Sequence, residues 1–92
     1  LIISQVCKFY SVDENVLRGT LKNKGVAEAR QMAMYLIRKL TNLSLPDIGK
    51  EFAKDHSTVL YAIRKVEVAL KNGDKTIQDN IQTITANINA CL

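Results

Sequence analysis

Apolar residues recur along the chain at intervals of three and four positions, which is the period of an α-helix. The two clearest stripes both have successive spacings of four, three and four residues: Val59, Ile63, Val66 and Leu70, followed by Ile77, Ile81, Ile84 and Ile88. Two earlier segments carry further stripes: Ile2, Ile3, Val6 and Phe9 within residues 1–10, then Ala29, Ala33, Leu36 and Leu40, flanked by Met32 and Ile37. No run alternates with a period of two, so the pattern predicts an all-α domain of about six helices.

Residues that favour helix ends divide the first half of the chain. Ser11 and Glu14 match a capping box, in which a serine and a glutamate satisfy amides at a helix start, so a short helix is predicted over about 12–18. The segment 19–25, GTLKNKG, contains two glycines and no periodicity, and we expect a basic loop there. A long helix is then predicted from Val26 onwards.

The sharpest local signal is the sequence SLPD in the middle of the chain. Ser44 is a favoured N-cap, and Pro46 lies just inside a helix start, where its missing amide proton costs nothing. This predicts a helix over about 45–53. Asp55 is the next candidate N-cap, for a helix over about 56–71.

Two helices joined by a tight turn form a helix-turn-helix, which is therefore predicted over about 45–71. The second helix of such a motif lies in the major groove of DNA and presents its first turn to the base edges. Here that turn consists of four short or polar residues, Asp55, His56, Ser57 and Thr58. A generic helical turn is the alternative interpretation.

The distribution of charge favours a polyanionic partner. The chain has a formal net charge of +4, and residues 18–39 alone hold six basic residues against one acidic residue. Nucleic acid is the commonest polyanion that such a segment binds. A merely solvated basic face is the alternative.

Other classes of protein find little support in the composition. Cys7 and Cys91 cannot build a zinc site with the one histidine, so we expect free, buried thiols in a reducing cytoplasm. No apolar run approaches the roughly 20 residues of a membrane span. The 92 residues suffice for one domain, 1–92, and because they open on an apolar helix without Met we expect a fragment of a longer protein.

Four blocks of sequence resemble one known family. They are a basic loop before a Val-Ala pair (Leu17 to Ala27), RQMAMYL (Arg30 to Leu36), TNLSLPDIGKEF (Thr41 to Phe52) and KDHSTVLYAIRK (Lys54 to Lys65). In this order they are similar to the C-terminal, origin-recognition domain of the DnaA family of bacterial replication initiators, strongly over about 16–67. The resemblance implies a Trp-repressor-like helix-turn-helix fold that binds double-stranded DNA.

The resemblance assigns base contacts to six positions. Lys22 matches an arginine that enters the minor groove. Leu45 and Pro46 match an apolar pair that touches thymine methyl groups. The turn that reads bases in the major groove is matched by Asp55, His56 and Ser57. Pro46 also starts a helix and Asp55 also caps one, while Lys22 is otherwise a solvated loop residue.

The resemblance also assigns phosphate contacts, which fix the register on DNA without reading its sequence. They fall on Lys24, Arg30, Gln31, Arg38, Lys54 and Thr58. The alternative for Arg30 is a surface salt bridge with Glu28 or a neighbour, and for Lys24 a solvated lysine.

One departure concerns the turn of the motif. Where the family has GGRDH, this chain has Ala53-Lys54-Asp55-His56, which is one residue shorter and lacks glycine. A shorter turn changes the expected angle between the two helices. The contacts of Pro46 and His56 with DNA need not keep the family's relative positions.

The resemblance implies that the chain recognises DnaA boxes at the chromosomal origin and acts in the bacterial cytoplasm. The chain lacks a phosphate-binding loop with the sequence GK[ST], so we expect that it is not an enzyme. The resemblance implies an AAA+ ATPase that binds ATP and Mg²⁺ in another domain of the longer protein. Contacts with other initiator copies are likewise expected in the domains that this chain does not contain. We expect the fragment to be monomeric. The alternatives are a helix-turn-helix transcriptional repressor, which usually needs a dimer, and an interaction module that uses the isoleucine stripe 77–88.

Overall fold

The computed structural model describes residues 1–20 and 23–92, and within these ranges it contains helices and no strands. The helices are α1 (Ile2–Tyr10), α2 (Glu14–Arg18), α3 (Lys24–Leu40), α4 (Leu45–Phe52), α5 (His56–Lys71) and α6 (Lys75–Ala90). The prediction of an all-α fold with six helices is confirmed for this part of the chain.

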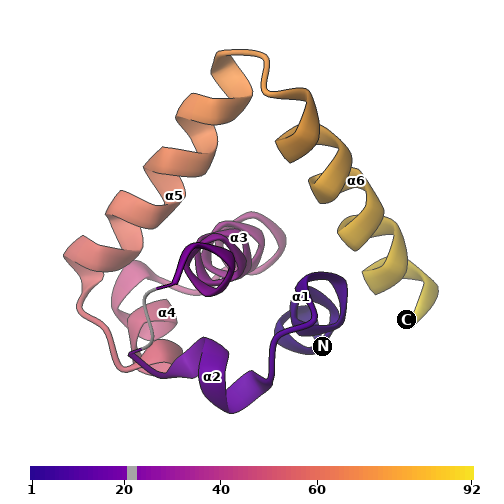
Figure 1. Cartoon of the computed structure of the whole chain (residues 1–92). Helices are drawn as coiled ribbons and strands as arrows, with labels where there is room; N and C mark the ends of the chain where they lie inside the picture. Colours follow the sequence, from indigo (N-terminus) through magenta and orange to yellow (C-terminus); the bar gives the residue numbers. More distant parts are fainter. Residues whose placement is uncertain (21–22) are drawn as a thin grey trace.

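The long helix α3 lies at the centre, and the other helices are arranged around it (Figure 1). It packs against α1, α2, α4 and α5. Most of its surface is covered, and its buried residues are Val26, Ala29, Arg30, Met32, Ala33, Met34, Tyr35, Leu36 and Ile37. A helix that is buried on several sides acts as a scaffold, and here it holds the two helices of the predicted DNA-binding motif.

The predicted stripes of α5 and α6 both face the core. Their buried members are Val59, Ile63, Val66, Ile84 and Ile88, and the half-buried members packed against the core are Leu70, Ile77 and Ile81. The isoleucine stripe is therefore part of the domain core, as expected, rather than a free face for another chain.

One member of the α3 stripe departs from the prediction. Leu40 is 44% exposed, although its spacing places it on the buried face. It belongs to the last turn of α3, where it lines two open hollows and is therefore only partly covered.

The start of α2 also differs from the prediction. Ser11 is not its N-cap; it has a left-handed backbone (φ 55°, ψ 46°) and ends α1, where the amide of Val12 donates to the carbonyl of Cys7 at 3.0 Å. Asp13 caps α2 instead and accepts from the amide of Asn15 at 2.8 Å. Aspartate and serine are similarly good N-caps, so the sequence offers both positions.

The long helix begins earlier than the predicted Val26. Asn23 is its N-cap, and the Oδ1 atom of Asn23 accepts from the amide of Val26 at 2.9 Å. The polar cap, rather than the first apolar residue, sets the start of the helix. Lys24 is therefore an exposed residue of the first helical turn and not part of a loop.

The two cysteines have different environments, and neither forms a disulfide. Cys7 is buried as predicted, and this burial raises the pKa of its thiol. Cys91 is exposed, so the prediction was wrong for it: α6 ends at Ala90, one residue earlier. Its Sγ accepts from Nε2 of Gln5 at 3.3 Å, which places the end of the chain against α1.

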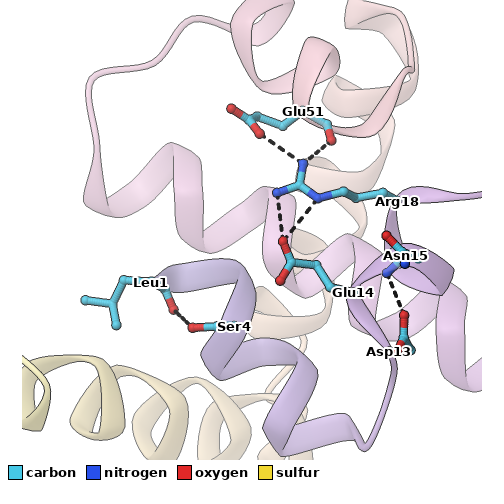
Figure 2. Close-up of polar contacts among 7 residues, drawn as sticks. All are labelled: Leu1, Ser4, Asp13, Glu14, Asn15, Arg18 and Glu51. Atoms are coloured by element: carbon cyan, nitrogen blue, oxygen red, sulfur yellow. Dashed lines mark hydrogen bonds and ion pairs between the residues drawn. The ribbon is translucent and has the colours of Figure 1, made fainter.

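A charged bridge fixes α4 relative to α2. Arg18 at the end of α2 lies between two carboxylates: Nη2 is 3.2 Å from Oε1 of Glu14, and Nη1 is 3.0 Å from Oε2 of Glu51 (Figure 2). Nη1 also donates to the backbone carbonyl of Glu51, in the last turn of α4. The hydrogen bond with Glu51 raises the pKa of Arg18. A cation at this position also interacts favourably with the negative end of the helix dipole of α4.

We predict that Ile63→Ala lowers the free energy of unfolding by about 2–5 kcal/mol, because it leaves a cavity in the core. Thermal melting followed by circular dichroism measures this loss. The exposed Val68→Ala on the same helix is the control and should melt within a few degrees of the wild type. An unchanged melting temperature for Ile63→Ala would show that the wrong face of α5 has been placed inside.

Candidate nucleic-acid interface

The turn between α4 and α5 is closed by backbone contacts. Ala53 adopts a left-handed conformation (φ 53°, ψ 42°), and the amide of Lys54 donates to the carbonyl of Gly49 at 2.9 Å. This is the hydrogen bond of a Schellman motif, which ends a helix with one left-handed residue. A Cβ atom on residue 49 would overlap the carbonyl oxygen of Lys54, so glycine is required at that position.

The first turn of α5 projects into solvent. Asp55 is the N-cap, as predicted, and its Oδ1 accepts from the amide of Thr58 at 2.9 Å. This hydrogen bond lowers the pKa of the Asp55 carboxyl, because it stabilises the ionised form. His56, Ser57 and Thr58 are all exposed. The helix thus presents hydrogen-bonding side chains and backbone amides at one accessible end.

A hollow of about 420 Å³ lies beside this turn, and we refer to it as the α3–α5 hollow. Its lining comes from three parts of the chain: Thr20 after α2; Ala27, Arg30, Gln31 and Met34 of α3; and Lys54, Thr58, Tyr61 and Ala62 at and after the turn. Four of the six predicted phosphate contacts are therefore brought together. Two of them, Arg30 and Lys54, are basic, so the hollow is suited to an anion.

Arg30 is not the surface residue that its place off the apolar stripe suggests. It is 9% exposed, and its guanidinium donates to carbonyls at the end of α2: Nε to Leu17 at 2.8 Å, and Nη2 to Gly19 at 3.0 Å and Val16 at 3.3 Å. Burial lowers the pKa of the guanidinium, which still remains charged at neutral pH. Arg30 therefore orders the segment that enters the hollow.

The start of α4 presents the predicted apolar pair. The Oγ atom of Ser44 accepts from the amide of Asp47 at 3.2 Å and caps the helix, as expected. Pro46 is exposed and Leu45 is half-buried against the core. Next to them, Nη1 of Arg38 donates to the carbonyl of Leu43 at 3.0 Å, which places this predicted phosphate ligand beside the start of α4.

The other two predicted phosphate ligands, Lys24 and Arg38, are not among the residues that line the hollow. Lys24 is exposed at the start of α3, and the predicted minor-groove residue Lys22 lies outside the described residues. Thr20 and Tyr61, in contrast, line the hollow and were not singled out from the sequence. The signal for Tyr61 was its spacing of three residues from Thr58, which places the two side chains on neighbouring parts of one helix face.

Other kinds of site find no support in the described part of the chain. It contains no group of three or more His, Cys, Asp or Glu residues that could hold a metal ion. None of its helices has the length and apolar character needed to cross a membrane.

A family model described as the bacterial DnaA protein helix-turn-helix matches residues 1–66 of the chain. The chain belongs to this family. The resemblance inferred from the sequence blocks is confirmed, and the fold described above is that of a DnaA C-terminal helix-turn-helix DNA-binding domain.

Individual members of the family are similar to this DnaA domain in sequence and in structure. The chromosomal replication initiator protein DnaA of Corynebacterium aurimucosum is 46% identical over 95% of this chain and 16% of its own length. The DnaA protein of Limosilactobacillus reuteri is 44% identical over 95% of this chain and 20% of its own. A crystal structure of a DNA replication initiation factor matches with a TM-score of 0.79 and 35% identity, over 95% of this chain and 28% of that one. The chain thus spans a fifth or less of these two DnaA proteins.

The left-handed Ala53 leads to a stability prediction for the turn. A side chain with a Cβ atom is strained in this conformation and glycine is not, so we expect Ala53→Gly to stabilise the DnaA domain by about 1 kcal/mol. Chemical denaturation measures the change. The control is Ala69→Gly inside α5, which should destabilise by about 1 kcal/mol because glycine disfavours a helix interior. Equal losses of stability in the two variants would contradict the conformation of Ala53.

Proposed function

We propose that this DnaA domain binds double-stranded DNA sequence-specifically, at DnaA boxes of the replication origin, and so supports the initiation and regulation of chromosomal replication. The observation that supports this function is the position of the exposed first turn of α5 next to the α3–α5 hollow. A helix start in the major groove can reach the base edges, and an anion-binding hollow at its side can hold the adjacent backbone phosphates of the same duplex.

Base recognition is assigned to both helices of the motif. The carboxylate of Asp55 has acceptor capacity beyond its cap, so it can accept from a cytosine amino group. His56 can donate to a purine acceptor, and Ser57 can bond to either kind of base edge. At the start of α4, Leu45 and Pro46 meet thymine methyl groups. Lys22 is proposed to enter the adjacent minor groove.

Phosphate binding is assigned to residues in and around the hollow. Gln31, Lys54 and Thr58 carry donors at its surface, and Arg30 adds positive charge from its buried position. Two exposed cations extend this set along α3, Lys24 at its start and Arg38 near its end. Because these groups come from several elements, they fix the register of the domain on DNA without reading its sequence.

In the whole initiator, this domain would deliver other parts of the protein to the origin. We propose that those parts include an AAA+ ATPase that binds ATP and Mg²⁺, and that contacts with other initiator copies are made there. The domain itself is proposed to act as a monomer on one asymmetric site in the bacterial cytoplasm. A transcriptional repressor is a second use of the same motif, and a need for two symmetric half-sites would favour it.

We predict that His56→Ala abolishes the preference for a DnaA box over a shuffled duplex, because a base contact in the first turn of α5 is lost. Such contacts contribute about 1–3 kcal/mol to discrimination. Fluorescence anisotropy with the two duplexes measures the ratio of the dissociation constants. Thr76→Ala, in the capped and exposed first turn of α6, is the matched control and should keep the wild-type ratio. Retention of the wild-type box affinity and preference by His56→Ala would refute base recognition by this residue.

For the hollow, we predict that Lys54→Gln weakens binding to both duplexes alike and lowers the slope of log K against log salt by about 1, because one phosphate contact is lost. Titrations at several salt concentrations measure the slope. The control is Lys71→Gln, which removes an exposed lysine at the far end of α5. A loss confined to the box, or the same change of slope in both variants, would contradict a phosphate contact at Lys54.

A further inference from the structure

One aromatic residue of the chain stands apart from the core. Tyr61 is 64% exposed, whereas Phe52 and Tyr35 are buried and Phe9 and Tyr10 are half-buried against the core. An aromatic side chain contributes most to folding when its ring is covered, so the fold leaves this ring without a structural use. An exposed tyrosine with a free hydroxyl is typical of binding surfaces.

Tyr61 lies on the part of α5 that continues from the proposed DNA-reading turn. It follows Ser57 by one helical turn, about 6 Å along the axis, and its direction around the helix falls between those of Ser57 and Thr58. Its side chain lines the α3–α5 hollow together with Gln31 and Lys54. The residue therefore belongs to the same face as the groups assigned to phosphates.

A cation accompanies the ring. The Nζ atom of Lys65 lies 6.0 Å from the centroid of the Tyr61 ring, at the outer limit of a cation–π contact. Both residues are exposed, so the pair contributes little to the stability of the domain. Together, the hydroxyl donor of Tyr61 and the positive charge of Lys65 are suited to bind a backbone phosphate.

We propose that Tyr61 is a further DNA-binding residue of this domain, whose hydroxyl donates to a backbone phosphate beside the groove, while Lys65 supplies charge to the same strand. This inference rests on the proposed function. Tyrosine hydroxyls are among the donors that bind phosphates in protein–DNA complexes. The first turn of α5 reaches the base edges, and a residue one turn later lies against the wall of the groove, where the phosphates are.

The test is Tyr61→Phe, which keeps the ring and its contact with Lys65 and removes only the hydroxyl. Titrated against a DnaA box duplex and a shuffled duplex, this variant should bind both at least about 10-fold more weakly, as expected for the loss of one hydrogen bond to a charged group. The ratio of the two dissociation constants and the salt slope should stay at their wild-type values, because neither a base contact nor a charge is removed. Wild-type affinity for both duplexes, or a loss confined to the box, would overturn the proposal.

A second variant tests the role of the lysine. Lys65→Gln should lower the salt slope by about 1 on both duplexes, while Lys71→Gln leaves it unchanged. Equal slopes for the two variants would show an effect of net charge alone and would contradict the contact of Lys65.

These outcomes separate this inference from the recognition of DnaA boxes. If the wild-type domain binds both duplexes equally, sequence recognition is contradicted, yet a loss for Tyr61→Phe on both duplexes still supports the phosphate contact. If the wild type prefers the box and Tyr61→Phe is unimpaired, the contact is refuted and recognition stands.

Discussion

The backbone of Gly49 lies against the carbonyl of Lys54, and the rest of the interface depends on this close approach. It brings the end of α4 next to the start of α5, and the hydrogen bond from the amide of Lys54 to the carbonyl of Gly49 holds the two together. Ala53 reverses the chain in a strained conformation, and Asp55 then starts α5 with its cap. Because Ile48, Phe52 and Val59 are fully buried on either side of the turn, the core fixes both helices and directs their polar ends outward.

The positive charge of residues 18–39 is divided between folding and binding. Arg18 is held by Glu14 and Glu51, where it connects α2 with α4, and Arg30 is bonded to carbonyls at the end of α2. Both residues therefore order the elements around the interface. Net charge per segment overstates the charge that a partner meets, since a guanidinium between carboxylates is largely neutralised. Lys24 and Arg38, two of the exposed cations of the segment, are better placed to meet DNA, as is Lys54 beside the hollow.

Helix number, the stripes of α5 and α6 and the caps Ser44 and Asp55 follow from the sequence, because periodicity and short polar caps are local properties. Features that depend on contacts between distant parts of the chain cannot be predicted from these local patterns. Both Ser11 and Asp13 are suitable N-caps, and only the packing of α1 on α2 decides between them. Leu40 continues an apolar stripe but remains 44% exposed at the end of α3.

The same limit applies to the candidate interface. Its first turn was predictable from Asp55 to Thr58, since an N-cap followed by polar residues marks an exposed helix start. The α3–α5 hollow was not predictable, because Thr20, Gln31 and Tyr61 belong to three segments that only the folded structure brings together. The burial of Arg30 was equally hidden, since its partners include backbone carbonyls, which every sequence contains.

In the proposed interface, the first turn of α5 and the hollow form one surface that a duplex covers at once. The change in amide chemical shifts when the isotope-labelled domain is titrated with a DnaA box duplex tests this arrangement. The largest changes should fall on residues 54–58, on Thr20 and Gln31 and on the start of α4, with little change in α6. Changes concentrated on α1 and α6, with residues 54–58 unaffected, would contradict it.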